Sequence, residues 1–209
     1  MNDLRGCRLC PRLVAFRKEQ QARHPGYHNQ PVGSFGADRA RLLIVGLAPG
    51  LHGANATGRP FTGDSSGSLL FETLHRFQFA NLDRSLGGDD GLRLRNCRIT
   101  NAVKCLPPEN RPLAGEINTC NRYLRDEISA LAGGSVLLAL GTVAHRAILR
   151  AMDLKQSSYR FRHAAEYSLP NGLKLFDSYH PSRYNQNTGR LTGDMLAGVF
   201  ERVEAVSHD

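Results

Sequence analysis

The stretch that most constrains this chain is a short apolar run followed by a long loop rich in glycine. Residues 42–45 read LLIV, which is typical of a buried β-strand, and residues 46–64 read GLAPGLHGANATGRPFTGD. Connections from a strand to a helix usually have about 2 to 6 residues, so a loop this long usually carries a function. In open α/β sheets ligands bind where such loops leave the carboxyl ends of strands. The segment therefore predicts a strand that ends in a binding site.

The order of apolar and amphipathic runs predicts the rest of the fold. The chain has 209 residues, of which 41% are hydrophobic, so we expect a single domain over residues 1–209. Alternating strand-like and helix-like runs favour a doubly wound α/β fold with a parallel sheet. Strands are expected at residues 41–45, 97–103, 135–140 and 174–179, with an edge or hairpin element near 159–169. Helices are expected at 11–23, 67–77, 114–131, 142–152 and 192–206, and an exposed loop at 81–95.

Charge and hydropathy narrow the class of partner. The net charge is +8, with 23 arginines against four lysines, which suits a polyanion such as nucleic acid. A GC-rich genome produces the same arginine bias, so charge permits nucleic acid binding without establishing it. No apolar run reaches the roughly 18 residues that span a bilayer, and residues 1–6 lack the apolar core of a signal peptide. We therefore expect a cytoplasmic protein that does not associate with membranes.

The five cysteines point to a metal centre rather than to disulfides. Cys7 and Cys10 form a C-x-x-C pair, a spacing that lets two thiolates bind one metal centre, and Cys105 and Cys120 supply two more sulfur atoms. Four thiolates suit either zinc or a [4Fe-4S] cluster, and spacing alone does not choose between them. Cys97 opens an apolar strand and is expected to be a small core residue.

Two further motifs follow predicted strands. Residues 100–105 read TNAVKC and place Asn101 at a strand end, where its amide can both donate to and accept from a base edge such as that of uracil, or can simply cap a turn. Residues 179–182 read YHPS and lead into a polar, basic loop at 183–190. His180 alone among the histidines ends a strand and precedes a proline. His52 in the first loop is a secondary candidate, while His145 and His163 look like surface or helix-face residues.

These motifs together resemble the uracil-DNA glycosylase superfamily, and most closely its family 5, the type b enzymes. The resemblance rests on residues 46–50 (GLAPG) and 58–64 (GRPFTGD), on 100–105, and on HPS followed by TGRLT at 188–192. With the cysteines it covers nearly the whole chain. It implies a three-layer α/β/α fold with a central four-stranded parallel sheet. It also implies that Cys7, Cys10, Cys105 and Cys120 hold a structural [4Fe-4S] cluster rather than zinc.

One position separates this family from the related family 4, type a. Family 4 has a glutamate where this chain has Leu47, so the first motif here offers no carboxylate to activate water. In family 5 that role belongs to the aspartate after Phe-Thr-Gly, which is Asp64. Gly50 departs from the alanine expected in many type b members, and this difference does not change the assignment.

The resemblance implies a role for each motif in a monofunctional DNA-repair glycosylase that flips a base out of the duplex. Phe61 would stack on the base, Asn101 would read its edge, Asp64 would stabilise the cationic sugar and orient water, and His180 would donate a hydrogen bond to the leaving base. The loop made of Gly46, Leu47, Ala48, Pro49 and Gly50 would bind the base or the nearby phosphate through its available backbone N–H groups. Contacts to DNA would come from Ser182, Arg183, Asn185 and Arg190. None of the motifs places a lysine obviously for a Schiff base.

The implied substrate is DNA that contains uracil or deaminated bases, and the protein is expected to be a monomer. Because Leu47 is apolar, a roomier pocket that also admits hypoxanthine or other damaged bases is consistent with the motif. The alternatives are a family 4 glycosylase and a non-catalytic zinc or iron–sulfur module that binds nucleic acid. Asp64 argues against the module, since a lone carboxylate would repel phosphate. A flavodoxin-like nucleotide binder lacks its G-x-G-x-x-G after the first strand.

Overall fold

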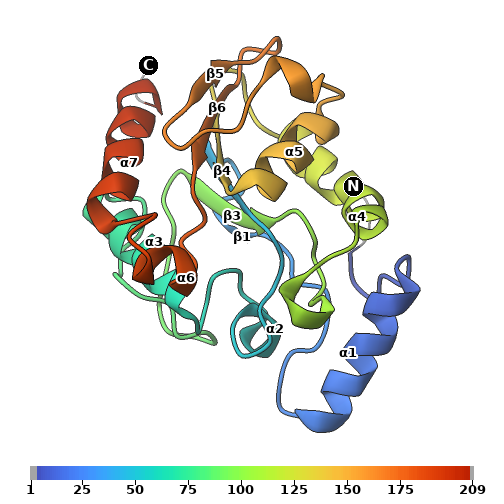
Figure 1. The fold of residues 1–209 in the computed structure, drawn as a ribbon. Coiled ribbons are helices and arrows are strands. Elements are labelled where there is room, and N and C mark those ends of the chain that lie inside the picture. Colours follow the sequence, from blue (N-terminus) through green and yellow to red (C-terminus); the bar gives the residue numbers. More distant parts are fainter. Residues whose placement is uncertain (1–3, 208–209) are drawn as a thin grey trace.

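A six-stranded sheet forms the centre of the molecule in the computed structural model, which describes residues 4–207 (Figure 1). The strand order is β1-β3-β2-β4-β6-β5. Their bounds are β1 Phe35–Gly36, β2 Leu42–Gly46, β3 Cys97–Asn101, β4 Val136–Leu140, β5 Glu166–Ser168 and β6 Lys174–Ser178. The inner four strands run parallel, and β1 and β5 pair antiparallel at the two edges. The predicted four-stranded parallel sheet is confirmed, and the two short edge strands extend it.

Burial explains why the inner strands form where they do. Every residue of β2 and β4 is buried, as parallel strands covered by helices on both faces require. Leu42 and Ile44 face one apolar core, while Leu43 and Val45 face the other, because side chains alternate along a strand. Residues 42–45 therefore contact the cores on both sides of the sheet, as the expected α/β/α layering requires.

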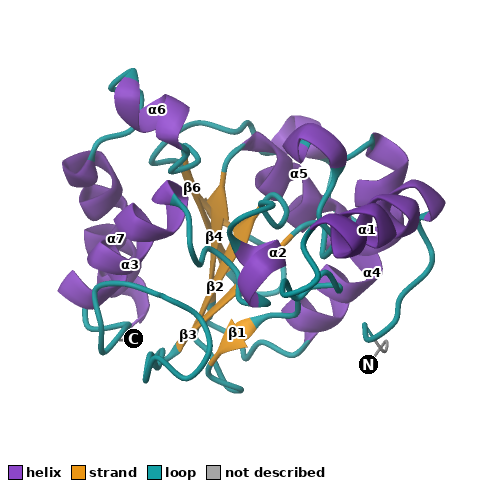
Figure 2. Ribbon diagram, turned by 90° about the horizontal axis from the view of Figure 1, so that it is seen from below, coloured by secondary structure: helices purple, strands orange, loops and turns teal. Residues whose placement is uncertain are grey.

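Helices cover both faces of the sheet (Figure 2). Helices α3 and α7 contribute to the first core, and α4 and α5 contribute to the second. Helix α1 joins the cysteine-containing segments through Leu13. Within residues 4–207 no helix is both long and apolar enough to cross a bilayer. The helix bounds are α1 Pro11–Arg23, α2 Ala54–Thr57, α3 Ser65–Arg76, α4 Ala114–Ser129, α5 Thr142–Ala151, α6 Arg183–Asn187 and α7 Gly193–Ser207, with single 3-10 turns at Pro108–Asn110 and Gln156–Ser158.

Two of these helices were not foreseen. The loop expected at residues 183–190 begins as the short helix α6, because the Ser182 hydroxyl accepts a hydrogen bond from the Asn185 backbone N–H and so caps a helix start. Helix α2 occupies one turn inside the long glycine-rich loop and ends at Gly58, which has a left-handed φ of 76°. Both are too short to show a helical apolar period in sequence.

The segment at residues 81–95 is more anchored than the exposed loop that was expected. Leu92 and Leu94 are buried in the first core, and Leu94 forms an isolated bridge with Ala80. The Asp90 carboxylate is held by the Arg59 guanidinium at 2.7 Å. The glycines in the segment made it look solvated, whereas its apolar and acidic side chains attach it to the protein.

The expectation for His145 was wrong. Its side chain is buried on α5, where Nδ1 lies 2.7 Å from Asp177 Oδ1 and Nε2 lies 2.9 Å from the Tyr159 carbonyl oxygen. Burial raises the pKa of Asp177, against the hydrogen bond and charge of His145. The pair joins α5 to β6, and its two residues are 32 positions apart in the sequence. No local sequence pattern could therefore have predicted that His145 is buried.

Candidate active site

Three loops that leave the carboxyl ends of β2, β3 and β6 meet at one pocket. The pocket has about 260 Å³ of space not filled by protein atoms. It is lined by Ala48, Gly50, Ala54, Phe61, Asp64, Ser66, Asn101 and His180. The four side chains assigned by resemblance to base excision, Phe61, Asp64, Asn101 and His180, are therefore brought together from segments that lie far apart in sequence.

Asn101 is held at the pocket floor by strand pairing. It ends β3 opposite Gly46 of β2, and the pairing continues beyond the strands through Ala102 N–H to Gly46 O at 2.9 Å. The Asn101 side chain is 3% exposed. A Cβ at position 46 would lie 2.4 Å from Asn101 Oδ1 and 2.5 Å from Phe61 Cζ. Glycine at this position therefore lets the amide and the aromatic ring approach the backbone closely.

Phe61 is fixed in an unusual conformation at the pocket wall. Its φ of 55° is left-handed, which costs energy for a residue other than glycine. Its ring is 6% exposed and lies 5.9 Å from the His180 ring, centroid to centroid, with 27° between the planes. The Phe61 carbonyl approaches Gly67 so closely that any Cβ there would clash. Packing on both sides thus holds the aromatic ring beside the imidazole.

Asp64 caps helix α3 and turns one oxygen toward the pocket. Its Oδ1 accepts a hydrogen bond from the Gly67 backbone N–H at 2.9 Å, and its position at the helix N-terminus favours negative charge. The other oxygen, Oδ2, faces the loop at Gly50 and Gly53, where a Cβ at position 53 would lie 2.8 Å away. The carboxylate is exposed, so a substrate and a water molecule can reach it.

His180 as a residue is half-buried at the pocket, while its imidazole is largely enclosed and neutral. Burial lowers its pKa to about 4, so the imidazole carries no charge at neutral pH and offers one N–H donor. The backbone of His180 is fixed by the Asn185 side chain, whose amide donates to the His180 carbonyl at 2.8 Å. A Cβ at Gly141, which follows β4, would touch the His180 Cβ at 3.4 Å.

The segment after His180 divides into internal and exposed parts. Ser182 and Asn185 make hydrogen bonds within the protein, as described above, so their predicted contacts with DNA would add to these bonds. Arg183 is exposed, and Arg190 is exposed with its guanidinium 4.6 Å from the centroid of the Tyr179 ring. The two arginines are therefore available to a bound strand, and their DNA contacts stay a prediction.

Sequence reasoning missed Ala54 and Ser66 in the pocket lining, and it missed Gln186 beside the pocket. Ser66 lines the pocket, and its place in the first turn after the Asp64 cap was the signal that could have found it. Gln186 donates to the Ser65 carbonyl at 3.1 Å and to the Pro181 carbonyl at 2.6 Å, which connects α6 to the start of α3. Ser65 and Gln186 lie 121 positions apart, and nothing local signals their contact.

Two other residues of the motif segments, the secondary candidate His52 and Lys104, lie away from the pocket lining. The secondary candidate His52 is exposed, and its Nδ1 lies 2.9 Å from the Tyr27 hydroxyl. Lys104 belongs to the second motif, but its side chain is fully buried and its Nζ pairs with Glu127 at 2.7 Å and donates to the Thr100 hydroxyl. The ammonium is therefore occupied in an ion pair rather than offered to a sugar.

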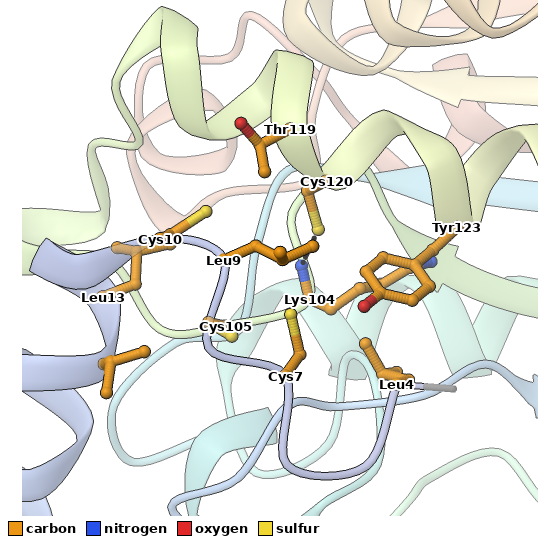
Figure 3. Close-up of a pocket in the computed structure, with 11 residues that line it drawn as sticks. Leu4, Cys7, Leu9, Cys10, Leu13, Lys104, Cys105, Thr119, Cys120 and Tyr123 are labelled. Atoms are coloured by element: carbon orange, nitrogen blue, oxygen red, sulfur yellow. Dashed lines mark hydrogen bonds between the residues drawn. The ribbon is translucent and has the colours of Figure 1, made fainter. Parts of the chain in front are cut away.

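The four cysteines assigned to a cluster line a second pocket (Figure 3). Cys7 and Cys10 come from the chain before α1, Cys105 from the loop after β3, and Cys120 from α4. Leucine side chains and the ring of Tyr123 complete the lining. Within residues 4–207 no three Cys, His, Asp or Glu side chains are gathered closely enough to count as a metal site as they stand.

The donor set nevertheless suits a metal–thiolate centre. The Lys104 backbone N–H donates to Cys120 Sγ at 3.2 Å, which is the kind of contact that stabilises a thiolate. Burial raises the pKa of Cys105 to about 12 and that of Cys120 to about 11, so a metal that binds these sulfurs must displace their protons. Cys97 is buried in the first core and takes no part, as expected.

Known proteins resemble this chain over most of its length. Residues 33–204 match the family model described as the uracil DNA glycosylase superfamily. The chain belongs to the uracil-DNA glycosylase superfamily. A type-5 uracil-DNA glycosylase of Thermus thermophilus is 46% identical over 205 residues, covering 96% of this chain and 93% of that protein. One of Pyrobaculum aerophilum is 40% identical, covering 98% and 91%.

A type-4 uracil-DNA glycosylase of Pyrobaculum aerophilum is also similar to this member of the superfamily, at 33% identity over 95% of this chain and 86% of that protein. The lower identity to the type-4 enzyme agrees with the distinction drawn from Leu47 and Asp64. The assignment to family 5 is thereby confirmed, whereas the roles of individual site residues remain predictions.

Proposed function

We propose that this protein is a monofunctional DNA-repair glycosylase that hydrolyses the N-glycosidic bond of uracil in DNA and leaves an abasic site. The observation that carries the proposal is the pocket that joins one exposed carboxylate, Asp64, to an amide, a neutral imidazole and an aromatic ring. An identity of 46% to a type-5 uracil-DNA glycosylase supports the same reaction.

Base recognition follows from the side chains that line the pocket. A base inside a duplex must leave the stack to reach the floor of the pocket, so the enzyme must flip the nucleotide. The Asn101 amide presents both a donor and an acceptor, which complements the N–H and carbonyl of uracil. The Phe61 ring would contact the face of the base. Hypoxanthine and other deaminated bases are further substrates consistent with the apolar Leu47.

Bond cleavage requires stabilisation of opposite charges on the sugar and on the base. Asp64 places its Oδ2 at the pocket side, where it can stabilise a cationic sugar and orient the attacking water. The neutral His180 can donate its N–H to the oxygen of the leaving base. Lys104 is buried in an ion pair with Glu127, which supports hydrolysis by water without a Schiff base.

The four cysteines would hold a [4Fe-4S] cluster. When bound, the cluster supplies a covalent connection between the chain before α1, the loop after β3 and helix α4, and it takes no part in the hydrolysis. Cys105 lies four residues after Asn101, so this connection supports the segment that reads the base. Iron and sulfide content, together with visible absorbance, distinguish the cluster from zinc.

DNA that contains uracil or deaminated bases would bind across the pocket as substrate, with Arg183 and Arg190 on its phosphates. We propose that the protein acts as a monomer in the cytoplasm. The competing reading is a non-catalytic metal-containing module that binds nucleic acid, which the charge of +8 would also allow.

An oligonucleotide panel tests the proposed function directly. The purified protein is incubated with labelled duplexes carrying uracil, hypoxanthine or thymine opposite guanine, and abasic sites are then cleaved with alkali. Cleavage at uracil is expected, and cleavage at hypoxanthine would extend the range of bases. Binding to every duplex without any abasic product would support the non-catalytic module and overturn the proposal.

A further inference from the structure

Arg17 of α1 has an unmet requirement for negative charge. The side chain is buried, with the residue 7% exposed, and its Nη2 donates to the Cys7 carbonyl at 3.0 Å. Its Nε and Nη1 atoms are fully buried and have no hydrogen-bond partner among the residues that the structure describes. A buried guanidinium with unpaired N–H groups is costly, so a further acceptor is expected at this position.

The neighbouring cations do not share this requirement. Arg12 pairs with Glu116 at 2.7 Å, and Lys104 pairs with Glu127 at 2.7 Å. No carboxylate pairs with Arg17 within residues 4–207. Arg12 and Lys104 each have a carboxylate as counter-ion, whereas the charge of Arg17 is not balanced by a carboxylate among the described residues.

The cysteine pocket supplies the missing partner. The Arg17 guanidinium binds the backbone of one proposed ligand, Cys7, and its positive charge acts on another, Cys105. Four thiolates around either Zn²⁺ or an oxidised [4Fe-4S]²⁺ core carry a net charge of about −2. Sulfur atoms in such centres accept N–H hydrogen bonds, which tune their charge and potential.

We propose that Arg17 is the counter-cation and hydrogen-bond donor of the metal centre held by the four cysteines, with Nε and Nη1 directed at thiolate or sulfide sulfur. The inference rests on the proposed metal centre and names a residue of that centre beyond its four cysteines. It gives α1 a function, because the helix places this guanidinium on the side of the cysteine pocket. It also accounts for why an arginine is buried next to the cysteine-containing segments.

The test uses the holoprotein as purified and the variants Arg17→Met and Arg17→Lys. The matched control is Arg23→Met, which removes an exposed arginine on the same helix that pairs with Glu19. Metal and sulfide content, the rate of metal loss to a chelator, and the reduction potential of an iron–sulfur centre are measured for each protein.

Arg17→Met is expected to lose metal at least about tenfold faster than the parent, since it removes hydrogen bonds to a charged group. Its reduction potential is expected to fall, because loss of a positive charge disfavours the more negative reduced centre. Arg17→Lys should keep the potential closer to that of the parent, and Arg23→Met should match the parent in both measurements. A purely structural role of Arg17 would not move the potential.

A second measurement needs no variant and covers the case in which Arg17→Met does not fold. In the parent labelled with ¹⁵N-arginine, the Arg17 Nε–H signal should shift or couple magnetically when the metal is bound and change on chelation. An Arg17 signal that is insensitive to the metal, or unchanged metal loss and potential in Arg17→Met, would overturn this inference while leaving the centre in place. A purified protein that holds neither zinc nor iron would overturn the centre itself, and the inference with it.

Discussion

At the scale of single residues, the site depends on how Asp64 divides its two oxygens between the fold and the pocket. Oδ1 is used as the cap of α3, while Oδ2 faces the pocket loop beside Gly50 and Gly53. An asparagine would keep one oxygen for the cap, while it would lose the charge and replace the other oxygen with an NH2 donor. Structure and chemistry can therefore be separated at this position by one substitution.

Asp64→Asn should lower single-turnover excision of uracil by about 10² to 10³-fold, the usual effect of removing one electrostatic contact in a transition state. Duplex binding and the melting temperature should stay close to those of the parent. Asp38→Asn, at an exposed aspartate, is the control. Equal rates for Asp64→Asn and the parent would show that the carboxylate is not catalytic.

Gly46→Ala tests the close approach of Asn101 and Phe61 to the backbone. The new Cβ would fall within 2.6 Å of both side chains and displace them. We expect excision to slow by about 10²-fold, since misplacement by about 1 Å is that costly. Gly133→Ala is the matched control, because a Cβ there meets no atom within 4 Å. A rate for Gly46→Ala equal to that of the control would contradict the geometry.

His180 should not titrate in the range where a histidine usually does. Burial lowers its pKa in the folded protein to about 4, against about 6.5 when unfolded. The unfolded chain therefore takes up the proton first as pH falls, and this residue lowers stability between about pH 6.5 and 4.

Its consequence for activity is that excision measured from pH 5 to 8 should show no inflection near 6.5 that depends on His180. The profile of His180→Gln should run parallel to that of the parent at a lower rate. An inflection near pH 6.5 in the parent that the variant lacks would contradict this prediction.

At the scale of elements, the segment 81–95 supports the pocket loop from behind. The Arg59 guanidinium binds the Asp90 carboxylate and the Gly88 carbonyl, and it lies 4.5 Å from the centroid of the Phe35 ring of β1. The Thr62 hydroxyl lies 2.6 Å from that of Ser85. Residues on both sides of Phe61 are therefore attached to this segment, so its loss should disturb the pocket.

Asp90→Asn should destabilise the protein by about 2 kcal/mol near neutral pH. Burial alone would raise the pKa of Asp90, but hydrogen bonds from Arg59 and from backbone N–H groups lower it to about 2. Its stabilisation is therefore present above about pH 4 and is lost as pH falls toward 2. Urea unfolding from pH 6 to 3 should show the parent–variant difference shrinking below about pH 4, and a constant difference would contradict the prediction.

At the scale of the whole molecule, a parallel sheet places the loops that follow its strands on one side, at the carboxyl ends of the strands. The loops after β2, β3 and β6 meet there, and Arg183 and Arg190 lie in the segment that follows β6. Arg95, by contrast, is exposed just before β3 begins, on the side of the amino ends of the strands. DNA that reaches the pocket should therefore contact Arg183 and Arg190 and should not contact Arg95.

Salt dependence of DNA binding measures these contacts. Arg183→Ala and Arg190→Ala should each reduce the slope of log affinity against log salt by about 1, as expected for one lost phosphate contact. Arg95→Ala should leave the slope unchanged. Equal slopes for all three variants would place the DNA elsewhere on the surface.

The four inner strands and the main helices could be predicted because their signals are local. Runs such as LLIV at 42–45 are buried on both faces, and burial of that kind requires continuous apolar sequence. The site motifs were found because strand ends in such a sheet meet at one edge. The edge strand β1 was missed because two residues carry no period, and α6 was missed because its cap, Ser182, reads as an ordinary loop residue.

By itself, the sequence determined the α/β class, the four parallel strands, four of the pocket side chains and the family, since each depends on residue types in a short, ordered pattern. Tertiary structure alone decided which side chains are buried and which charged groups already have a partner. It buried His145 against Asp177 and paired Lys104 with Glu127, and among the described residues it left two nitrogen atoms of Arg17 without a hydrogen-bond partner. Such pairings join residues distant in sequence, and their energies depend on burial and distance, which only the folded chain sets.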